Sequence, residues 1–353
     1  MSEEPELFTR VERTVGRFTL NRPAALHALT LAMCHEMIAA LSAWRGDRNV
    51  HLVMIDHAGE RGFCAGGDIR NLAAGHAGDG SPPWNFFYRE YQLDHQLFTY
   101  DKPTLSIMDG VVMGGGVGIA LPCRYRIATE KTTFAMPETG IGLFPDVGGG
   151  WYLSRLPGRA GYWMALTGAR IKAADCLALG LATHFVPHER LEGFKASVIA
   201  NPDAIEALLA EFAGDPGPAP IAENRTRIDA LFAAHTVEGV VEALTADGSD
   251  WALAQLAILK TKSPTMSKVA LRQLLTGAKA ASFADNLVME FRIAARSVPS
   301  PDFTEGVRAT IIDRDNKPAW NPATIEGVTE ADVDRFFAPM PEGEDWVPLE
   351  ETA

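Results

Sequence analysis

The first part of the chain alternates short apolar runs with stretches of helical spacing. Apolar and polar residues alternate over 14–20, and a β-branched apolar run covers 50–56, so we expect strands there. Apolar residues at helical spacing over 29–44, behind Thr30 as a candidate N-cap, predict a helix. Further strands are expected at 104–108, 125–129 and 132–135. Strands that alternate with helices over this length indicate an α/β fold with crossover connections.

The pattern changes after about residue 188, where strand signals fade and helical periodicity dominates. A proline- and glycine-rich stretch at 214–220 predicts a long turn. Helices are expected after it at 221–234, 237–244, 251–260, 264–275 and 284–297. Ser263 and Pro264 suit the N-cap and the first helical position. We therefore predict an α/β core over residues 1–190 and a helical C-terminal region over 191–353.

Composition narrows the classes of function. The 353 residues are 47% hydrophobic and 22% charged, which is close to the globular average and excludes wholesale disorder. The net charge of -13 argues against a nucleic-acid partner, which requires a basic field. The most apolar window, 104–122, contains Asp109 and five glycines, so a strand and a turn explain it better than a membrane helix. We expect neither a nucleic acid nor a membrane as partner.

Cysteine spacing and the N-terminus bear on cofactors and location. The four cysteines are widely spaced without a CxxC pair, which predicts neither a disulfide framework nor a zinc site. We expect Cys64 to be a packed small residue and no metal or redox cofactor to be required. The first residues are acidic and lack the apolar segment of a signal or transit peptide, so a cytoplasmic location is expected.

Three glycine-rich segments carry the candidate chemistry, at 62–69, 109–118 and 136–150. The first two each follow an expected strand, where glycine lets backbone N–H groups point at a ligand without an intervening side chain. Two such N–H groups can converge on one oxygen as an oxyanion hole. The alternative is that these glycines serve only tight turns or close helix packing.

The third segment places Glu138 and Asp146 eight residues apart among apolar neighbours. A carboxylate in such surroundings can have a raised pKa and act as a base or a nucleophile. The structural alternative for Asp146 is to cap a helix that begins near Val147. Glu138 has no equivalent structural explanation.

The three segments in this order resemble the enoyl-CoA hydratase/isomerase (crotonase) superfamily. They read GFCAGGDI, MGGGVG and MPETGIGLFPDVGGG, and they follow an N-terminal stretch with LNRP and ALHAL. Within the superfamily, the aspartate at 146 and the long C-terminal region resemble the 3-hydroxyisobutyryl-CoA hydrolases. The resemblance implies a crotonase (ClpP-like) fold, in which a ββα superhelix core is followed by helices.

The resemblance also implies the site and its residues. The N–H groups of Gly67 and Gly115 would form the oxyanion hole for a CoA thioester. Glu138 matches the catalytic glutamate, Asp146 the aspartate of the hydrolase subgroup, and Glu90 a residue of the acyl pocket. Further substrate contacts are expected from Leu26, Cys64, Ala65, Asp68 and Ile69.

One departure separates the chain from the hydratases, which carry a second catalytic glutamate where this sequence has Gly118. We therefore expect hydrolysis of a small 3-hydroxyacyl-CoA, with 3-hydroxyisobutyryl-CoA of valine breakdown as the favoured substrate. CoA is then part of the substrate, and no separate cofactor is implied. An enoyl-CoA hydratase or isomerase and a non-catalytic CoA-binding protein remain the alternatives. Superfamily members often form homo-oligomers, and the C-terminal region leaves the oligomeric state open.

Overall fold

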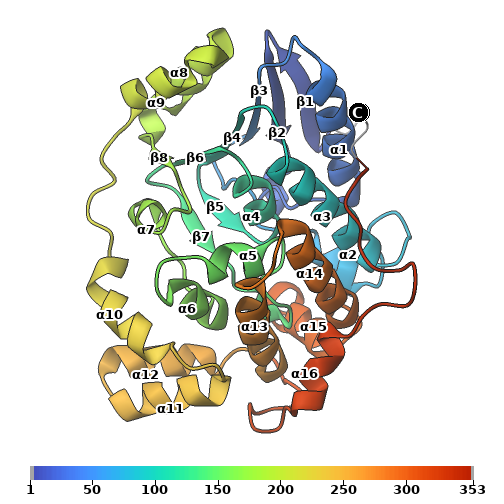
Figure 1. Ribbon diagram of the computed structural model, residues 1–353, viewed down its shortest axis with the longest axis vertical. Coiled ribbons are helices and arrows are strands. Elements are labelled where there is room, and N and C mark those ends of the chain that lie inside the picture. The colour runs from blue at the N-terminus through green and yellow to red at the C-terminus, as the bar shows by residue number, and fades with distance from the viewer. Residues whose placement is uncertain (1–3, 351–353) are drawn as a thin grey trace.

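Six strands form the central sheet of the computed structural model, which describes residues 4–350. Their order is β1-β2-β3-β4-β6-β8 (Figure 1). Only the first pair is antiparallel, and the other neighbours run parallel. The strands are β1 (Leu7–Glu12), β2 (Val15–Leu20), β3 (Leu52–His57), β4 (Thr104–Met108), β6 (Tyr125–Ala128) and β8 (His184–Phe185). The expected strands 14–20, 50–56, 104–108 and 125–129 are therefore confirmed.

A second, two-stranded sheet lies beside the first one. It pairs β5 (Val111–Met113) with β7 (Thr133–Ala135) in parallel. Strands β4 and β5 lead into helix α4 (Gly115–Ala120), and β6 and β7 lead into the short helix η2 (Glu138–Ile141). These repeated two-strand-and-helix turns are the superhelix that the crotonase fold requires.

Helices α1 (Leu31–Gly46) and α3 (Trp84–Phe98) cover one face of the central sheet, and α2 (Ile69–Ala73) is a short helix between them in the chain. Thr30 is the N-cap of α1, as predicted, and accepts a hydrogen bond from the Met33 N–H at 3.3 Å. The sequence pattern did not predict α3. Its buried face includes polar residues, which interrupt the apolar stripe that marks a helix: Glu90, Gln92, Asp94 and Gln96.

Further helices before the C-terminal region surround the sheets. They are η1 (Pro23–Ala25), α5 (Gly149–Ser154), α6 (Ala160–Thr167), α7 (Ala173–Ala178), α8 (His188–Ala200), η3 (Pro202–Ala204) and α9 (Ile205–Phe212). Helices α8 and α9 cover a smaller apolar cluster that includes Val15, Leu105 and Phe194. The sheet is therefore buried on both faces, as expected for parallel strands.

The C-terminal region is helical, as predicted, and it folds back onto the core (Figure 1). Its helices are α10 (Ile221–Leu231), α11 (Val237–Asp247), α12 (Asp250–Leu259), α13 (Pro264–Gly277), α14 (Phe283–Ser297), α15 (Pro301–Val307), η4 (Arg308–Ile312) and α16 (Glu330–Phe337). Ser263 is the N-cap of α13 with Pro264 at its first turn. Helix α13 packs on α5, α14 on α3, and α15 on η2.

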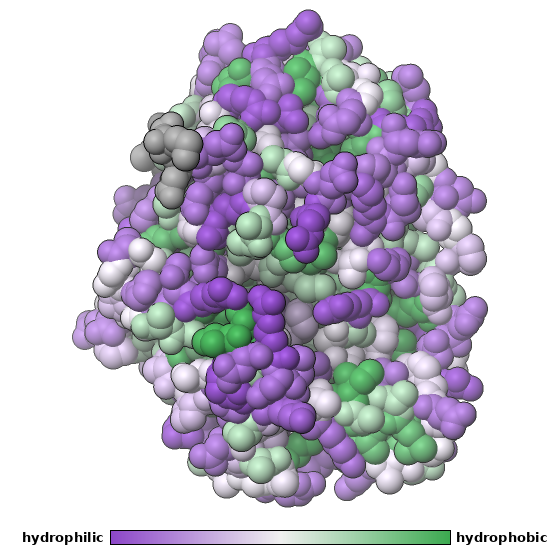
Figure 2. Space-filling model, turned by 180° about the vertical axis from the view of Figure 1, so that it is seen from behind, coloured by the Kyte–Doolittle hydropathy of each residue, from purple (hydrophilic) through white to green (hydrophobic). Residues whose placement is uncertain are grey.

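The main hydrophobic core runs through both parts of the chain, from Leu7 to Trp346. Division of the chain near residue 190 stays a prediction. Across residues 4–350, no helix combines the length and apolar character that crossing a membrane would need. Figure 2 shows one face of the molecule covered mostly by polar side chains, with apolar groups gathered near its lower end.

Candidate active site

Backbone pairing brings the first two glycine-rich segments together. Cys64 and Val112 form an isolated parallel bridge, and the Met113 N–H donates to the Cys64 carbonyl at 3.0 Å. A Cβ on Gly116 would lie 2.2 Å from that same carbonyl oxygen. Only glycine allows this approach, so at Gly116 the packing interpretation of the glycines is correct.

Strand pairing then adds the third segment. Met113 is opposite Ala135 in the β5–β7 pair. The chain therefore leaves β5 into Gly114 and Gly115 beside the point where it leaves β7 into Met136 and Glu138. Parallel register alone places the second glycine segment next to the catalytic carboxylate candidate.

A cavity of about 90 Å³ lies where the three segments meet. It is lined by seven of the ten predicted site residues, namely Ala65, Gly67, Ile69, Glu90, Gly115, Glu138 and Asp146. Gly115 is the first residue of α4, so its N–H has no acceptor within that helix. The cavity thus combines backbone donors with three carboxyl groups and apolar walls that include Phe86, Phe87 and Leu143.

The other three predicted residues do not line this cavity. Cys64 is fully buried, and burial raises the pKa of its thiol to about 12, as expected of a packed small residue. The Leu26 carbonyl accepts a hydrogen bond from the Ala65 N–H at 3.0 Å. Asp68 pairs with Arg22 at 2.9 Å. These contacts shape the first segment, and any contact of the three residues with CoA stays a prediction.

Glu138 is the first residue of η2 and is only 5% exposed. Its Oε2 has no hydrogen-bond partner in the protein. Burial, and then the charge of Asp146, raise the pKa of Glu138 well above the ordinary value, whereas Lys262 opposes this shift. A buried carboxyl with one oxygen left for a ligand is suited to nucleophilic or general-base chemistry.

Asp146 faces the same cavity, where its Oδ2 accepts a hydrogen bond from the Tyr91 hydroxyl at 3.1 Å. Burial, and then the charge of Glu290, raise its pKa to about 7. Helix α5 begins at Gly149 with Gly148 as its N-cap and no capping side chain. The alternative that Asp146 caps this helix is therefore wrong.

Glu90 reaches the cavity from α3, one turn after Phe86 and Phe87. Its Oε1 is buried without a partner. Burial, and then the charge of Asp146, raise its pKa well above the ordinary value. A Cβ on Gly115 would lie 2.2 Å from this Oε1, so the glycine is needed for the two segments to meet.

Two further buried carboxyls were missed by the sequence reasoning. Asp94 follows Glu90 by one helical turn, and neither of its oxygens has a partner. A Cβ on Gly118 would lie 2.6 Å from Asp94 Oδ1. Asp94 therefore packs against the position where hydratases carry their second glutamate. Glu290 is held by four donors next to Asp146. An i, i+4 spacing on α3 was a usable signal for Asp94, but no sequence pattern marks Glu290.

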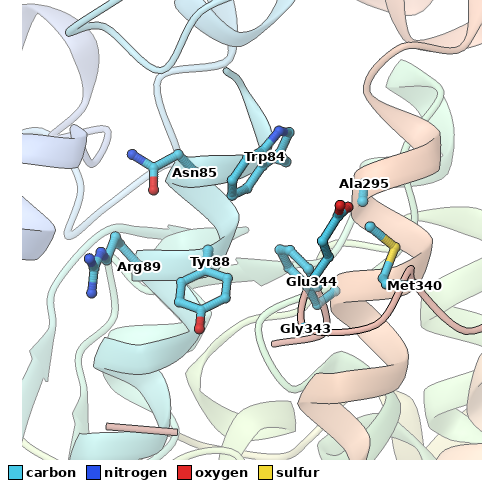
Figure 3. A pocket seen from close by; sticks show the side chains of 9 residues that line it. Trp84, Asn85, Tyr88, Arg89, Ala295, Met340, Gly343 and Glu344 are labelled. Carbon is cyan, nitrogen blue, oxygen red and sulfur yellow. The ribbon is translucent and has the colours of Figure 1, made fainter. Parts of the chain in front are cut away.

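A larger cavity of about 600 Å³ lies beside the opposite face of α3 (Figure 3). Trp84 and Tyr88 of α3 line one side, and α14 and residues 340–344 line the other. None of the three glycine-rich segments contributes to it. We therefore expect the reaction in the smaller cavity, because it brings the candidate backbone donors together with buried carboxyl groups.

The family model of enoyl-CoA hydratase/isomerase matches residues 15–337. The chain belongs to the enoyl-CoA hydratase/isomerase family. The expected crotonase fold and family membership are thus confirmed.

Curated relatives of this family member have names that specify one reaction within the family. Three of them are the mitochondrial 3-hydroxyisobutyryl-CoA hydrolases of Danio rerio, Xenopus laevis and Homo sapiens, at 44%, 43% and 40% identity. The alignments cover 95%, 92% and 94% of this chain and 90%, 86% and 88% of those proteins. The predicted resemblance to these hydrolases is confirmed.

Solved structures of the family share the fold over nearly the whole chain. A carnitinyl-CoA dehydratase from Mycobacterium thermoresistibile has a TM-score of 0.92 at 40% identity and covers 98% of this chain and 99% of its own. An enoyl-CoA hydratase from Rhodobacter sphaeroides 2.4.1 has a TM-score of 0.88 at 37% identity, with 97% and 100% covered. The C-terminal helices are therefore part of the shared architecture.

The relatives correct one expectation. The hydrolases that this family member resembles are named as mitochondrial. The expectation of a cytoplasmic location is contradicted by these names and is wrong against them. Within residues 4–350, no group of three or more His, Cys, Asp or Glu side chains is arranged to hold a metal ion.

Proposed function

We propose that this family member hydrolyses a small 3-hydroxyacyl-CoA thioester, with 3-hydroxyisobutyryl-CoA of valine breakdown as the substrate. The observation that carries the proposal is the buried Glu138, whose unpartnered Oε2 lies in one cavity with Gly67, Gly115, Glu90 and Asp146. The names of relatives at 40–44% identity agree with it.

In the proposed reaction the thioester carbonyl oxygen accepts hydrogen bonds from the Gly67 and Gly115 N–H groups. These donors stabilise the charge that develops on this oxygen, and losing one such donor typically raises the barrier by about 2.7–4 kcal/mol. Negative charge is poorly solvated in a cavity walled by phenylalanines, so fixed backbone donors contribute more there than in water.

Glu138 supplies the attack by one of two routes. In the first, its carboxylate oxygen bonds to the carbonyl carbon, the C–S bond breaks, and CoA leaves as the thiolate. Water then hydrolyses the resulting mixed anhydride and regenerates Glu138. In the second route, Glu138 takes a proton from a water whose oxygen bonds to the carbonyl carbon. The C–S bond of the resulting tetrahedral intermediate then breaks, and CoA leaves as the thiolate. Both routes need an ionised Glu138 with a free oxygen, and both end in the free hydroxy acid and CoA.

Specificity for a 3-hydroxyl group follows from Glu90 and Asp146. Each buries a carboxyl group at the cavity wall, and Glu90 Oε1 has no partner within the protein. A substrate hydroxyl satisfies such groups, whereas an acyl group without one leaves them unpaired. Isobutyryl-CoA should therefore be a poor substrate.

Hydration is the competing activity, since two proteins of high structural similarity are named as a hydratase and a dehydratase. Gly118 weighs against it, because hydration needs one group to activate water and another to manage the α-carbon proton. Asp94 fills the space beside Gly118 but is fully buried and does not line the cavity.

The experiment is release of free CoA thiol from 3-hydroxyisobutyryl-CoA, 3-hydroxypropionyl-CoA, isobutyryl-CoA and crotonyl-CoA. Fast release from the two hydroxylated substrates, lost in Glu138→Gln, is the expected result. Loss of enoyl absorbance from crotonyl-CoA without thiol release would identify a hydratase instead. CoA binding without turnover of any thioester would identify a non-catalytic binding protein.

Two further expectations belong to this proposal. The proposed hydrolysis uses only side chains, backbone groups and water. Removal of metal ions with EDTA should therefore leave the rate unchanged. Self-association into a homo-oligomer is expected from the superfamily, and sedimentation equilibrium measures it directly.

A further inference from the structure

A buried carboxylate from the C-terminal region accepts hydrogen bonds from the turn that carries Asp146. Glu290 of α14 has no exposed surface. Its Oε2 accepts the Gly148 N–H at 2.7 Å, and its Oε1 accepts the Gly150 N–H at 2.8 Å. Two side chains add to this, since Gln273 and Asn286 each donate to Oε1 at 2.9 Å. A carboxylate buried with four donors is a fixed structural element.

The turn that Glu290 holds has an unfavourable backbone. Val147 has a φ of +52°, which is a rare conformation for a β-branched residue, and Gly148 follows at +87°. Such a conformation persists only where the surroundings over-determine it. The bonds to Gly148 and Gly150 hold one side of the turn. On the other side, Gln273 donates to the Pro145 carbonyl at 2.6 Å.

We propose that Glu290 is a positioning residue, whose carboxylate holds the strained turn 145–150 so that Asp146 faces the acyl group of the substrate. The proposal rests on the role of Asp146 in the proposed function. It gives the C-terminal helix α14 a part in the reaction, although Glu290 does not line the cavity.

The charge of Glu290 also affects the pKa of Asp146. The ionisable groups around Asp146 are Tyr91, Glu90 and Asp94 on α3, Glu138 on η2, and Glu290 on α14. Burial raises the pKa of Asp146 first, and the Glu290 charge raises it further. Removal of that charge should therefore lower the pKa of Asp146, whichever protonation state is the active one.

The test compares Glu290→Gln, Asp146→Asn and Asp56→Asn by the pH dependence of kcat and by thermal unfolding. Asp56 is a matched control, since this residue of β3 is also buried but pairs with Arg17 of β2 and Lys195 of α8, away from the turn 145–150. Glu290→Gln is expected to lower kcat by roughly 10- to 100-fold, as small misplacements of reacting groups do. Its near-neutral pH limb should move to lower pH, whereas Asp56→Asn should lose stability without moving that limb.

The outcomes separate the two ideas. If Asp146→Asn removes the near-neutral limb, but Glu290→Gln leaves the limb in place and kcat within twofold, Glu290 is only structural and the inference fails. If Asp146→Asn changes neither the limb nor kcat, the proposed role of Asp146 fails, and the inference falls with it.

Should Glu290→Gln not fold, Gln273→Met serves instead, because it frees the Pro145 carbonyl but keeps both backbone bonds to Glu290. It should lower kcat by about 3- to 10-fold, and a kcat unchanged within twofold would overturn the proposal.

Discussion

Gly118 lacks a side chain because Asp94, which lies elsewhere in the sequence, packs against it in the structure. In the sequence it is only the absence of a second glutamate. In the structure, Asp94 occupies the space that a side chain on residue 118 would enter. The departure from the hydratase pattern is therefore a packing requirement as well as a change in chemistry.

Substitution of this glycine should be costly even with the smallest side chain. A Cβ on residue 118 would lie 2.6 Å from Asp94 Oδ1, so we expect Gly118→Ala to destabilise by about 1–3 kcal/mol. Urea unfolding measures the difference. Gly46→Ala is the matched control, because its Cβ would meet nothing within 4 Å and alanine suits a helix. Equal stabilities for the two variants would contradict the model of close packing.

Glu90 should control selectivity for the hydroxyl group. Glu90→Met keeps the length of the side chain but removes its polar atoms. A hydrogen bond typically contributes about 0.5–1.5 kcal/mol, so kcat/KM for 3-hydroxyisobutyryl-CoA should fall roughly 2- to 13-fold. The value for isobutyryl-CoA should not fall, because methionine leaves no polar group unpaired. Tyr88→Phe, on the opposite face of the same helix, should alter neither. An equal fall for both substrates would show that Glu90 does not read the hydroxyl.

At the scale of elements, the N-terminus of helix α13 connects the C-terminal region to the candidate active site. Ser263 caps α13 by accepting the Met266 N–H, and its hydroxyl donates to Asp302 at 2.5 Å. The Ser263 N–H also donates to the Thr139 carbonyl in η2, next to Glu138. One residue thus joins the start of a helix, a buried carboxyl and the catalytic segment.

Loss of this hydroxyl should cost more than loss of an ordinary cap. Ser263→Ala removes a cap, typically worth about 1 kcal/mol, and leaves Asp302 with one fewer donor. We expect about 2 kcal/mol in urea unfolding, against about 1 kcal/mol for Thr236→Ala. Thr236 caps α11 through the Gly239 N–H alone. Similar costs for the two variants would show that the Asp302 contact adds nothing.

At the scale of the whole molecule, five buried acids gather between α3, η2 and α14. They are Glu90, Asp94, Glu138, Asp146 and Glu290, and burial raises the pKa of each. An acid with a raised pKa in the folded state binds more protons than it does when unfolded. Its favourable contribution is complete below the ordinary pKa and is lost as pH rises through the folded value.

Asp146 allows a direct test of this dependence on pH. With its pKa raised to about 7, the carboxyl is largely neutral at pH 5 and largely ionised at pH 8. Asp146→Asn removes the buried charge at pH 8 but changes little at pH 5. The melting temperature of the variant relative to the parent should therefore rise between pH 5 and pH 8 in differential scanning fluorimetry. A constant difference would mean that Asp146 does not titrate in this range.

Local patterns were sufficient for much of the fold. Alternation and β-branched runs placed most of the strands, and Thr30 and Ser263 marked helix starts that the structure confirms. These features depend on neighbours within a few residues, so they are readable from order alone. Helix α3 was missed because polar residues such as Glu90 and Asp94 are buried on its inner face and interrupt the apolar stripe by which a helix is recognised.

The sequence by itself determined the family, the three glycine-rich segments and the residues Glu90, Glu138 and Asp146. Only the tertiary structure decided how these groups interact. Register between β5 and β7 brings Glu138 beside Gly115, and α14 brings Glu290 to a turn 140 residues earlier. Proton affinity and backbone strain depend on burial and on contacts across such separations, which no local pattern of residues encodes.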